Sequence, residues 1–375
     1  MLSSEKKFLF LFGWDDFFES QNHDLVYLSG EKPRSTGSLF PARVICEERN
    51  LYRLQAGLNK SFWASVSGKV QFNTVSRVDY PAIGGWVMVD LPGQSERGVI
   101  QQVLKRKTII HRKQVGASAD MQILSTNVDY VFITSSANSD LNYRRIERYL
   151  AVARDAGAVP VILLTKADTC LDSIDSVLAK TQKEFTGVQI HTISKDDFEK
   201  AEFLAGYLKK GTTSVFIGSS GVGKSTLVNF LIGNEQIRTQ DVREGDDKGR
   251  HTTTSRNLYV SRYGGLIIDT PGMRELQLSD HSEGVRTQFS DIEDLIQSCR
   301  FGDCQHQTEP ACAIKDALAD SSLSDGRWRS YQKLEAEVRH GMRRQNKVLA
   351  AEDRKIWKKI SIEARNKSRS KKGGI

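Results

Sequence analysis

The segment Gly218-Ser219-Ser220-Gly221-Val222-Gly223-Lys224-Ser225 matches the phosphate-loop pattern G-x4-G-K-[ST] at every fixed position. It lies between an apolar run, 215–217, and a helical stretch, 225–231, which is the strand–loop–helix context that the pattern requires. The glycines allow backbone N–H groups to surround a β-phosphate at the start of a helix. Lys224 is expected to neutralise the β- and γ-phosphates, and the Ser225 hydroxyl to coordinate Mg²⁺. The segment therefore predicts an α/β fold in which residues 218–226, up to and including Thr226, bind the phosphates of a nucleotide.

A second phosphate-contacting sequence follows downstream. An apolar strand ends in Asp269, and Gly272 stands three positions later. Asp269 is expected to hold Mg²⁺, through water, and the Gly272 N–H to reach the γ-phosphate. Between the two motifs, residues 249–254 read GRHTTT. A threonine there could close over Mg²⁺ and phosphate only when triphosphate is bound. Thr253 is the first choice for this role and Thr252 the second.

The base is expected to be guanine. Thr165-Lys166-Ala167-Asp168 ends an apolar strand and resembles the motif NKxD, with Thr in place of Asn. Asp168 would accept hydrogen bonds from guanine N1–H and the exocyclic amine, whereas adenine offers an acceptor at N1. Such a mismatch can discriminate by on the order of 10⁴. The Lys166 stem would cover the purine and Thr165 would give one hydroxyl contact, while the backbone at Ser194 would meet the guanine oxygen.

The order of these motifs is informative, because the guanine motif precedes the phosphate loop whereas ordinary small GTPases have the opposite order. From 129 to 272, apolar runs alternate with helical stretches such as 143–156. This alternation is typical of a parallel α/β sheet with helices on both faces. A parallel sheet tolerates permutation because the same strands can be joined by different loops. Residues 114–280 are therefore predicted to form a circularly permuted GTPase domain.

The preceding part, 37–113, contains about five short β-type runs separated by Gly and Pro. They predict an OB-type barrel, with a small open sheet as the alternative. Barrels of this type hold RNA with basic and aromatic groups, although core packing is the favoured role for the tryptophan. The candidates here are Lys105, Arg106, Lys107, Arg112, Lys113, Phe62 and Trp63. The N-terminal extension, 1–36, is assigned no role.

After the central domain, residues 281–340 read as helices around a cysteine and histidine cluster. Three thiolates and one imidazole make a full tetrahedral set for Zn²⁺, with no open position for a substrate. A single structural zinc ion per chain is therefore expected, against the alternative of a coincidental group of buried thiols. Asp303 and Glu309 are less favoured as ligands. The expected ligands are Cys299, Cys304, His306 and Cys312.

Composition excludes several classes of protein. A chain of 375 residues with 39% hydrophobic and 27% charged residues fits a globular protein of two or three domains. No window reaches the ~18 consecutive apolar residues of a membrane span, and five cysteines are too few for a disulfide scaffold. Because no signal-peptide cleavage site is recognisable, a cytoplasmic location is expected.

The net charge of +8 is concentrated at the C-terminal end. From Arg339 to Ile375 there are 13 Lys or Arg and 3 Asp or Glu. The tail, 341–375, therefore indicates a polyanionic partner with salt-sensitive phosphate contacts. A solvated tail without a ligand is the alternative.

Hydrolysis has an unusual feature at Met273. This residue follows Gly272, where many GTPases place the glutamine that orients the attacking water, and a thioether cannot do so. Slow intrinsic turnover and activation by a bound partner are therefore expected. His251 is the candidate for positioning the attacking water because it adjoins Thr252 and Thr253. A structural or RNA-contacting role for His251 is an equal alternative.

Taken together, these motifs resemble the bacterial ribosome small-subunit-dependent GTPase family, RsgA (also called YjeQ or YloQ), over about residues 37–340. The resemblance is carried by the motifs TKAD (165–168), GSSGVGKS (218–225), GRHTTT (249–254) and DTPG (269–272), and by the Cys/His cluster at 299–312. It implies a circularly permuted GTPase that acts late in small-subunit maturation and an OB barrel that binds rRNA. It also identifies the small ribosomal subunit as the partner that stimulates hydrolysis. The protein is expected to be a monomer that binds GTP with Mg²⁺ and has no membrane partner.

Two other functions stay open. An RNA-binding assembly platform could use GTP as a structural ligand without hydrolysing it, and Met273 keeps this alternative in consideration. An ATP-driven machine is disfavoured by Asp168. Competition between GTP and ATP, and phosphate release stimulated by the partner, separate the three functions.

Overall fold

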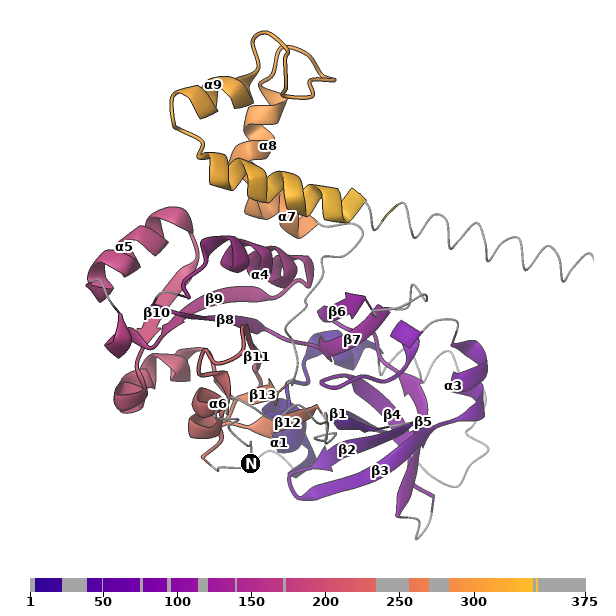
Figure 1. The fold of residues 1–375 in the computed structure, drawn as a ribbon. Coiled ribbons are helices and arrows are strands. Elements are labelled where there is room, and N and C mark those ends of the chain that lie inside the picture. The colour runs from indigo at the N-terminus through magenta and orange to yellow at the C-terminus, as the bar shows by residue number, and fades with distance from the viewer. Residues whose placement is uncertain are drawn as a thin grey trace, which may run out of the picture. The chain divides into compact units, whose positions relative to one another are not determined.

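A computed structural model describes most of the chain (Figure 1). The described residues are 4–21, 39–48, 50–74, 77–92, 96–113, 121–138, 140–170, 173–233, 256–269, 283–339 and 342. Contacts between residues divide the chain into two compact units. The first comprises 1–112 and 121–277, and the second comprises 113–120 and 278–375. Within the described ranges, no helix combines the length and hydropathy that crossing a membrane requires.

The first unit contains a five-stranded barrel, as the sequence predicts. Its strands are hydrogen-bonded in the order β1-β2-β3-β5-β4, and pairing between β4 and β1 closes the barrel. Alternate residues such as Ala42, Val44 and Leu54 point into an apolar core. The helix α3 (Gly68–Asn73) follows β3 and is capped by the side chain of Ser67. The strand bounds are β1 (Phe40–Glu48), β2 (Leu51–Gly57), β3 (Lys60–Val66), β4 (Trp86–Asp90) and β5 (Arg97–Val103).

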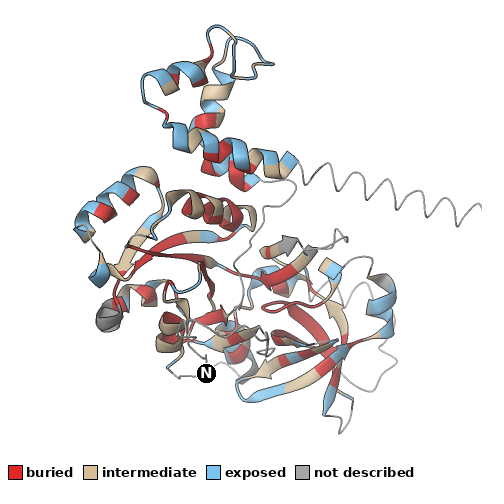
Figure 2. Cartoon of the chain, viewed as in Figure 1, coloured by how far each residue is buried: buried red, intermediate tan, exposed pale blue. Residues whose placement is uncertain are grey.

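A parallel sheet follows, with the strand order β10-β9-β8-β11-β13 and an antiparallel strand, β12, beside β13. Most strands that the sequence predicts as continuous apolar runs are buried, whereas the edge strand β10 is largely half-buried; this pattern confirms the α/β class (Figure 2). A short two-stranded sheet, β6 (Ile109–Lys113) with β7 (Met121–Thr126), precedes it. The bounds are β8 (Tyr130–Ser136), β9 (Val159–Thr165), β10 (Gln189–Ile193), β11 (Thr213–Gly218), β12 (Asn257–Val260) and β13 (Leu266–Asp269).

Helices cover both faces of this sheet. Figure 1 shows α4 and α5 on one face and α6 on the other. An apolar cluster that includes Phe132, Phe216 and Leu227 joins α6 to the strands. The helical bounds are α4 (Tyr143–Asp155), η2 (Ala167–Thr169), α5 (Ile174–Glu184), η3 (Lys195–Gly206) and α6 (Lys224–Ile232), and η1 (Arg77–Asp79) lies in the barrel. The sheet thus carries the phosphate-loop helix against its hydrophobic core.

The N-terminal segment, for which the sequence suggests no role, packs against the barrel. It forms α1 (Ser4–Leu11) and a second helical turn, 16–21. Its aromatic rings surround the fully buried Trp86 of β4, with ring-centroid distances of 6.1 Å from Phe8 and 4.9 Å from Trp14. Phe18 completes this cluster at 6.1 Å. The segment therefore supplies apolar cover for one side of the barrel.

Arg43 of β1 joins four segments of the first unit through its buried guanidinium. It donates to the carbonyl oxygen of Phe12 in the N-terminal segment and, at 3.0 Å, to that of Gly84. It also donates to the Asn127 carbonyl at 3.3 Å and to Thr213 Oγ1, at the start of β11, at 2.9 Å. Burial lowers the pKa of Arg43 to about 10. The guanidinium of Arg43 thus connects the N-terminal segment, the barrel, the turn before β8 and the phosphate-loop strand β11.

The second unit is helical. It contains α7 (Glu283–Gln288), α8 (Ser290–Gln297) and α9 (Ala313–Ala319), followed by a helix at 325–339. The last helix carries Trp328, Tyr331, Leu334 and Val338 at the three- and four-residue steps that predict it. Tyr331 and Leu334 are buried against the other helices, together with Phe289. The C-terminal helical part that the sequence predicts is confirmed.

Candidate functional site

The predicted nucleotide-binding motifs gather at the carboxyl edge of the parallel sheet. Gly218 at the end of β11 pairs with Thr134 of β8, and Thr165 at the end of β9 pairs with Ser136 of β8. On the far side, β11 pairs with β13, which ends in Asp269. Parallel strands end at the same edge, and this edge is where open α/β sheets bind ligands. The sheet therefore brings together motifs that are separated by up to about a hundred residues along the chain.

The phosphate loop has the backbone that its glycines predict. Gly218 has φ of +150°, and a Cβ there would lie 2.1 Å from the Thr134 carbonyl oxygen, so only glycine fits. Gly223 has φ of +94° and immediately precedes α6. The Lys224 ammonium donates to the Gly218 carbonyl at 2.8 Å and to the Ser219 carbonyl. The loop thus places a lysine and a helix start at the same point, which favours an anion.

Asp269 lies at the end of β13 on the other side of the phosphate-loop strand. Burial raises the pKa of its carboxyl group, and the positive charge of Lys224 opposes this shift. The carboxylate and the ammonium thus interact electrostatically across the edge of the sheet. This pairing suits a site in which a carboxylate faces a metal ion bound to phosphates.

Thr165, the first residue of the guanine motif, contacts the phosphate loop. Its side chain is buried, and its hydroxyl contacts the Val222 carbonyl at 2.7 Å and the Ser135 carbonyl at 3.2 Å. A hydroxyl that donates to these oxygens ties the guanine motif to the phosphate loop. Sequence reasoning missed this contact because nothing in the motif itself indicates a partner 57 positions away.

The rest of the guanine motif is accessible. Asp168 is exposed within η2, and Lys166 precedes it with a left-handed backbone, φ of +56°. Ser194 is buried just before η3. Several predicted site residues lie outside the described residues: His251, Thr252, Thr253, Gly272 and Met273.

Three cysteines and one histidine meet in the second unit. Their candidate ligand atoms, from Cys299, Cys304, His306 and Cys312, all lie within 4.8 Å of one another. His306 Nδ1 is 3.6 Å from Cys299 Sγ and 3.5 Å from Cys312 Sγ, and the two sulfurs are 4.0 Å apart. Ligands ~2.0–2.3 Å from a tetrahedral zinc ion lie ~3.5–3.8 Å from one another. The donor set and its spacing therefore fit zinc, as the sequence predicts for a metal site.

Glu309 organises the loop that carries His306. Its carboxylate accepts the backbone N–H groups of Gln305 and Gln307, each at 2.9 Å, and of Thr308 at 3.0 Å. Hydrogen bonds from the loop backbone lower the pKa of Glu309 to about 2. His306 itself has φ of +59° and packs edge-on against Trp328 at 5.6 Å. Glu309 thus supports the ligand loop from outside the cluster.

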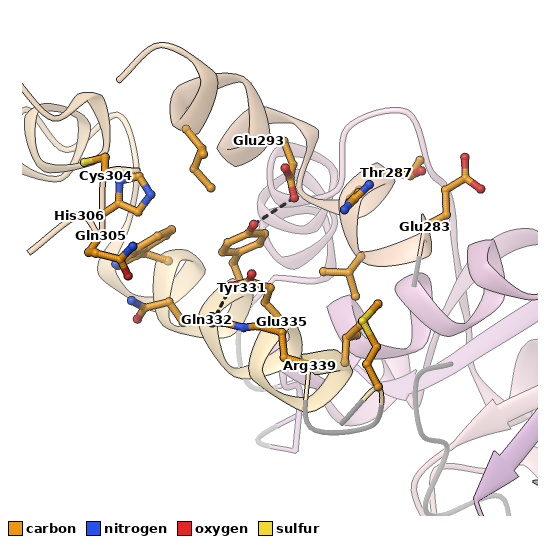
Figure 3. A pocket seen from close by; sticks show the side chains of 16 residues that line it. Glu283, Thr287, Glu293, Cys304, Gln305, His306, Tyr331, Gln332, Glu335 and Arg339 are labelled. Atoms are coloured by element: carbon orange, nitrogen blue, oxygen red, sulfur yellow. Dashed lines mark hydrogen bonds and ion pairs between the residues drawn. The ribbon is translucent and has the colours of Figure 1, made fainter. Parts of the chain in front are cut away.

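A groove of about 1060 Å³ borders this cluster. Figure 3 shows Cys304 and His306 at one end and Glu283 at the other, with Tyr331 and Glu293 facing each other between them. The Tyr331 hydroxyl donates to Glu293 at 3.0 Å. Every residue that lines the groove belongs to the second unit, so it is distinct from the phosphate-loop edge.

Two of the basic residues at the end of the barrel, Arg106 and Lys107, make contacts within the fold. Arg106 donates to the backbone carbonyls of Val78 and Tyr80, and Lys107 pairs with Asp15 of the N-terminal segment. Both cations thus contact other parts of the first unit, although Lys107, like Lys105, is exposed. Phe62 is half-buried and packs against the barrel core.

Comparison with known proteins gives consistent results. The sequence model of the RsgA GTPase family matches residues 103–279. The "Small ribosomal subunit biogenesis GTPase RsgA 1" of Oceanobacillus iheyensis is 44% identical over 86% of this chain and 92% of its own length. The "Small ribosomal subunit biogenesis GTPase RsgA 2" of Vibrio parahaemolyticus is 42% identical over 86% and 83%, respectively.

Solved structures share the fold. The crystal structure of YjeQ from Thermotoga maritima aligns with a TM-score of 0.59 and 23% identity, over 80% of this chain and 99% of that one. The structure of YloQ, described as a circularly permuted GTPase, aligns with a TM-score of 0.58 and 22% identity, over 83% and 98%. With its barrel, its sheet edge, its Cys/His cluster and relatives above 40% identity, this chain belongs to the RsgA family of P-loop GTPases.

Proposed function

We propose that this protein hydrolyses GTP at the carboxyl edge of its parallel sheet while it assists the maturation of the small ribosomal subunit. The observation that carries the proposal is the convergence of three sequence elements at that edge: the phosphate loop 218–225, the motif 165–168 and Asp269. The names of the relatives supply the ribosomal context.

The roles at the site follow from its chemistry. The loop amides and Lys224 bind the β- and γ-phosphates, and Ser225 and Asp269 hold Mg²⁺. Asp168 selects guanine, with Lys166 covering the ring. The backbone near Ser194 supports the guanine oxygen. Mg²⁺ neutralises charge on the phosphates when it is bound with GTP. Thr253, His251 and Gly272 keep their proposed roles at the γ-phosphate and the attacking water.

Zinc in the Cys/His cluster is proposed to be structural. Four protein ligands leave no position for a substrate, so the ion would stabilise the loop 299–312 and would not take part in hydrolysis. The compact spacing of the donor atoms supports this proposal.

The proposed partner is the small ribosomal subunit with its rRNA. The basic tail, 341–375, supports this proposal, since neutralising RNA phosphates with Lys and Arg makes binding depend strongly on salt. We propose that the protein acts as a monomer in the cytoplasm. Subunit binding that is unaffected by salt and by removal of the tail would contradict the role of the tail.

The experiment that tests the function measures phosphate release from GTP, with and without purified small subunits. The wild type is compared with Ser225→Ala and with Ser290→Ala, an exposed serine of the second unit, as the control. Stimulation by subunits in the wild type and the control, and its loss in Ser225→Ala, are expected. Equal binding of GTP and ATP would overturn the proposal. Subunit binding with GTP bound and no phosphate release would instead favour the non-hydrolysing platform.

A further inference from the structure

Arg145 contacts the phosphate loop from a part of the chain 74 residues earlier. Its Nη1 donates to Ser219 Oγ at 2.6 Å, and it lies 3.3 Å from Asp140 Oδ2. Ser219 is the second residue of the loop, directly after Gly218. Arg145 thus grips the loop through a side chain, whereas the other loop contacts described above involve backbone carbonyls.

The position of Arg145 is determined by well-packed structure. It lies in the first turn of α4, where the side chain of Asn142 accepts its backbone N–H at 3.1 Å. The following residues, Ile146 and Tyr149, are buried against the sheet. Strand β8, which leads into this helix, pairs with the phosphate-loop strand at Thr134 and Gly218. The base of the arginine side chain is therefore held in place beside the loop.

A second contact reaches the same serine. The hydroxyl of the buried Tyr149 is hydrogen-bonded to Ser219, one turn after Arg145 on the same face of α4. The carboxylate of Asp140 is half exposed, so its ion pair with Arg145 contributes little stability but keeps the guanidinium near the loop. Ser219 is thus held on two sides by one helix.

These contacts matter because the lysine restraint on the loop is temporary. In this structure Lys224 donates to the carbonyls of Gly218 and Ser219. If the lysine donates to two phosphates, its three N–H groups can keep at most one of those carbonyls, and the loop then depends more on its other contacts. The contact of Arg145 with Ser219 and that of Thr165 with the Val222 carbonyl do not involve the lysine.

We propose that Arg145 is a positioning residue that holds the phosphate loop, through Ser219, in the shape that receives the nucleotide. The proposal rests on the proposed function, because it takes 218–225 to be the phosphate-binding loop. A preorganised loop binds more tightly because less ordering remains to be done when the ligand arrives. Arg145 acts on the nucleotide through the loop and not by touching it.

The test is a double-mutant cycle of Arg145→Ala and Ser219→Ala in the full-length protein. The dissociation constants for Mg²⁺-GTP and Mg²⁺-GDP, and kcat and KM, are measured for each variant. Each single variant should bind both nucleotides ~10- to 100-fold more weakly, as expected for loss of a hydrogen bond to a charged group. The double variant should be no weaker than Ser219→Ala, and Arg145→Lys should recover part of the loss. Arg154→Ala, in the last turn of α4, is the matched control and should keep wild-type affinity.

Other outcomes would overturn the proposal. Wild-type affinity in Arg145→Ala would show that the contact does not position the loop. A fall in kcat for Arg145→Ala that Ser219→Ala does not share, with independent effects in the double variant, would place the guanidinium on the reacting phosphate instead. If Arg145→Ala lowers thermal stability, the nucleotide affinity of Ser219→Ala alone tests the proposal, because that variant removes only a hydroxyl. Failure of the wild type to bind GTP, or GTP binding that Lys224→Ala leaves unchanged, would reject the proposed function and not the contact.

Discussion

At the scale of single residues, the carboxylate of Glu309 shows how a side chain outside a metal cluster can shape it. It accepts hydrogen bonds from three backbone N–H groups of the loop around His306. Such outer contacts orient metal ligands and affect their affinity. The sequence suggests Glu309 as a less favoured metal ligand. In the structure its carboxylate instead supports the backbone of the ligand loop.

Replacing Glu309 by Ala should weaken zinc binding ~10- to 100-fold, since the loop that presents His306 loses its support. Zinc affinity is measured by competition with a chromophoric chelator. Asp303→Ala is the control, because Asp303 lies in the same loop and contributes its backbone carbonyl to the described contacts. An equal loss of affinity in both variants would contradict the special role of Glu309.

The buried hydroxyl of Thr165 is the second feature at this scale. Thr165→Val keeps the shape of the side chain but removes the hydrogen bonds to the Val222 and Ser135 carbonyls. We expect GTP affinity to fall about 3- to 10-fold, equivalent to about 1 kcal/mol, with the preference for GTP over ATP unchanged. Thr169→Val is the control, since the exposed Thr169 hydroxyl donates to the Lys166 carbonyl, within its own motif. Loss of base selectivity in Thr165→Val would show instead that the hydroxyl contacts the base.

At the scale of secondary-structure elements, β10 is joined to η3 by an aromatic cluster around His191. The imidazole stacks on Phe203 at 4.2 Å, and its Nε2 is 2.9 Å from the Tyr207 hydroxyl. Burial lowers the pKa of His191, so the folded protein favours the neutral ring. This edge of the sheet therefore depends on a histidine that stays uncharged.

Lowering the pH should destabilise this edge. Below about 6.5 the unfolded chain binds a proton at His191, whereas the folded chain binds it only below its own, lower pKa. The free energy of unfolding therefore falls as the pH drops from about 7 through the lowered pKa. His191→Phe should show a smaller fall between pH 7 and 5, measured by urea unfolding. Tyr207→Phe, which keeps the imidazole, should retain the wild-type pH dependence; an unchanged fall in His191→Phe would refute the assignment.

At the scale of the whole molecule, the first unit is continuous from the N-terminal segment to the nucleotide edge. Strand β12 pairs with β1 at Asn257 and Cys46, so hydrogen bonding passes from the α/β sheet into the barrel. Arg43 reinforces this connection from inside. The barrel and the GTPase sheet thus belong to one compact unit.

Arg43→Met should destabilise this unit by ~3 kcal/mol or more, because several buried oxygens lose a charged donor. We expect a lower midpoint of urea unfolding, with unfolding monitored by tryptophan fluorescence. Arg53→Met is the matched control on the neighbouring strand. Arg53 is exposed and donates to Ser61 Oγ at 3.3 Å, so a change within about 0.5 kcal/mol is expected. Equal free energies of unfolding for the two variants would show that the buried hydrogen bonds of Arg43 do not stabilise the first unit.

Much of the fold could be predicted from local patterns. The helix expected at 143–156 is α4, and the strand expected at 159–165 is β9. Each barrel run overlaps an observed strand, but the run 62–70 extends into α3, and the run 98–111 covers both β5 and the start of β6. The phosphate loop and the metal ligands were identified because their spacing is itself the signal.

The sequence by itself determined the order of the elements, the nucleotide motifs and the donor set of the metal cluster, because each is encoded in neighbouring residues. Only the tertiary structure decided the partners of Arg43, Arg145 and Thr165, and the way in which the N-terminal segment covers Trp86. Those contacts join residues tens of positions apart, and their energy comes from burial and hydrogen bonding that no local pattern records.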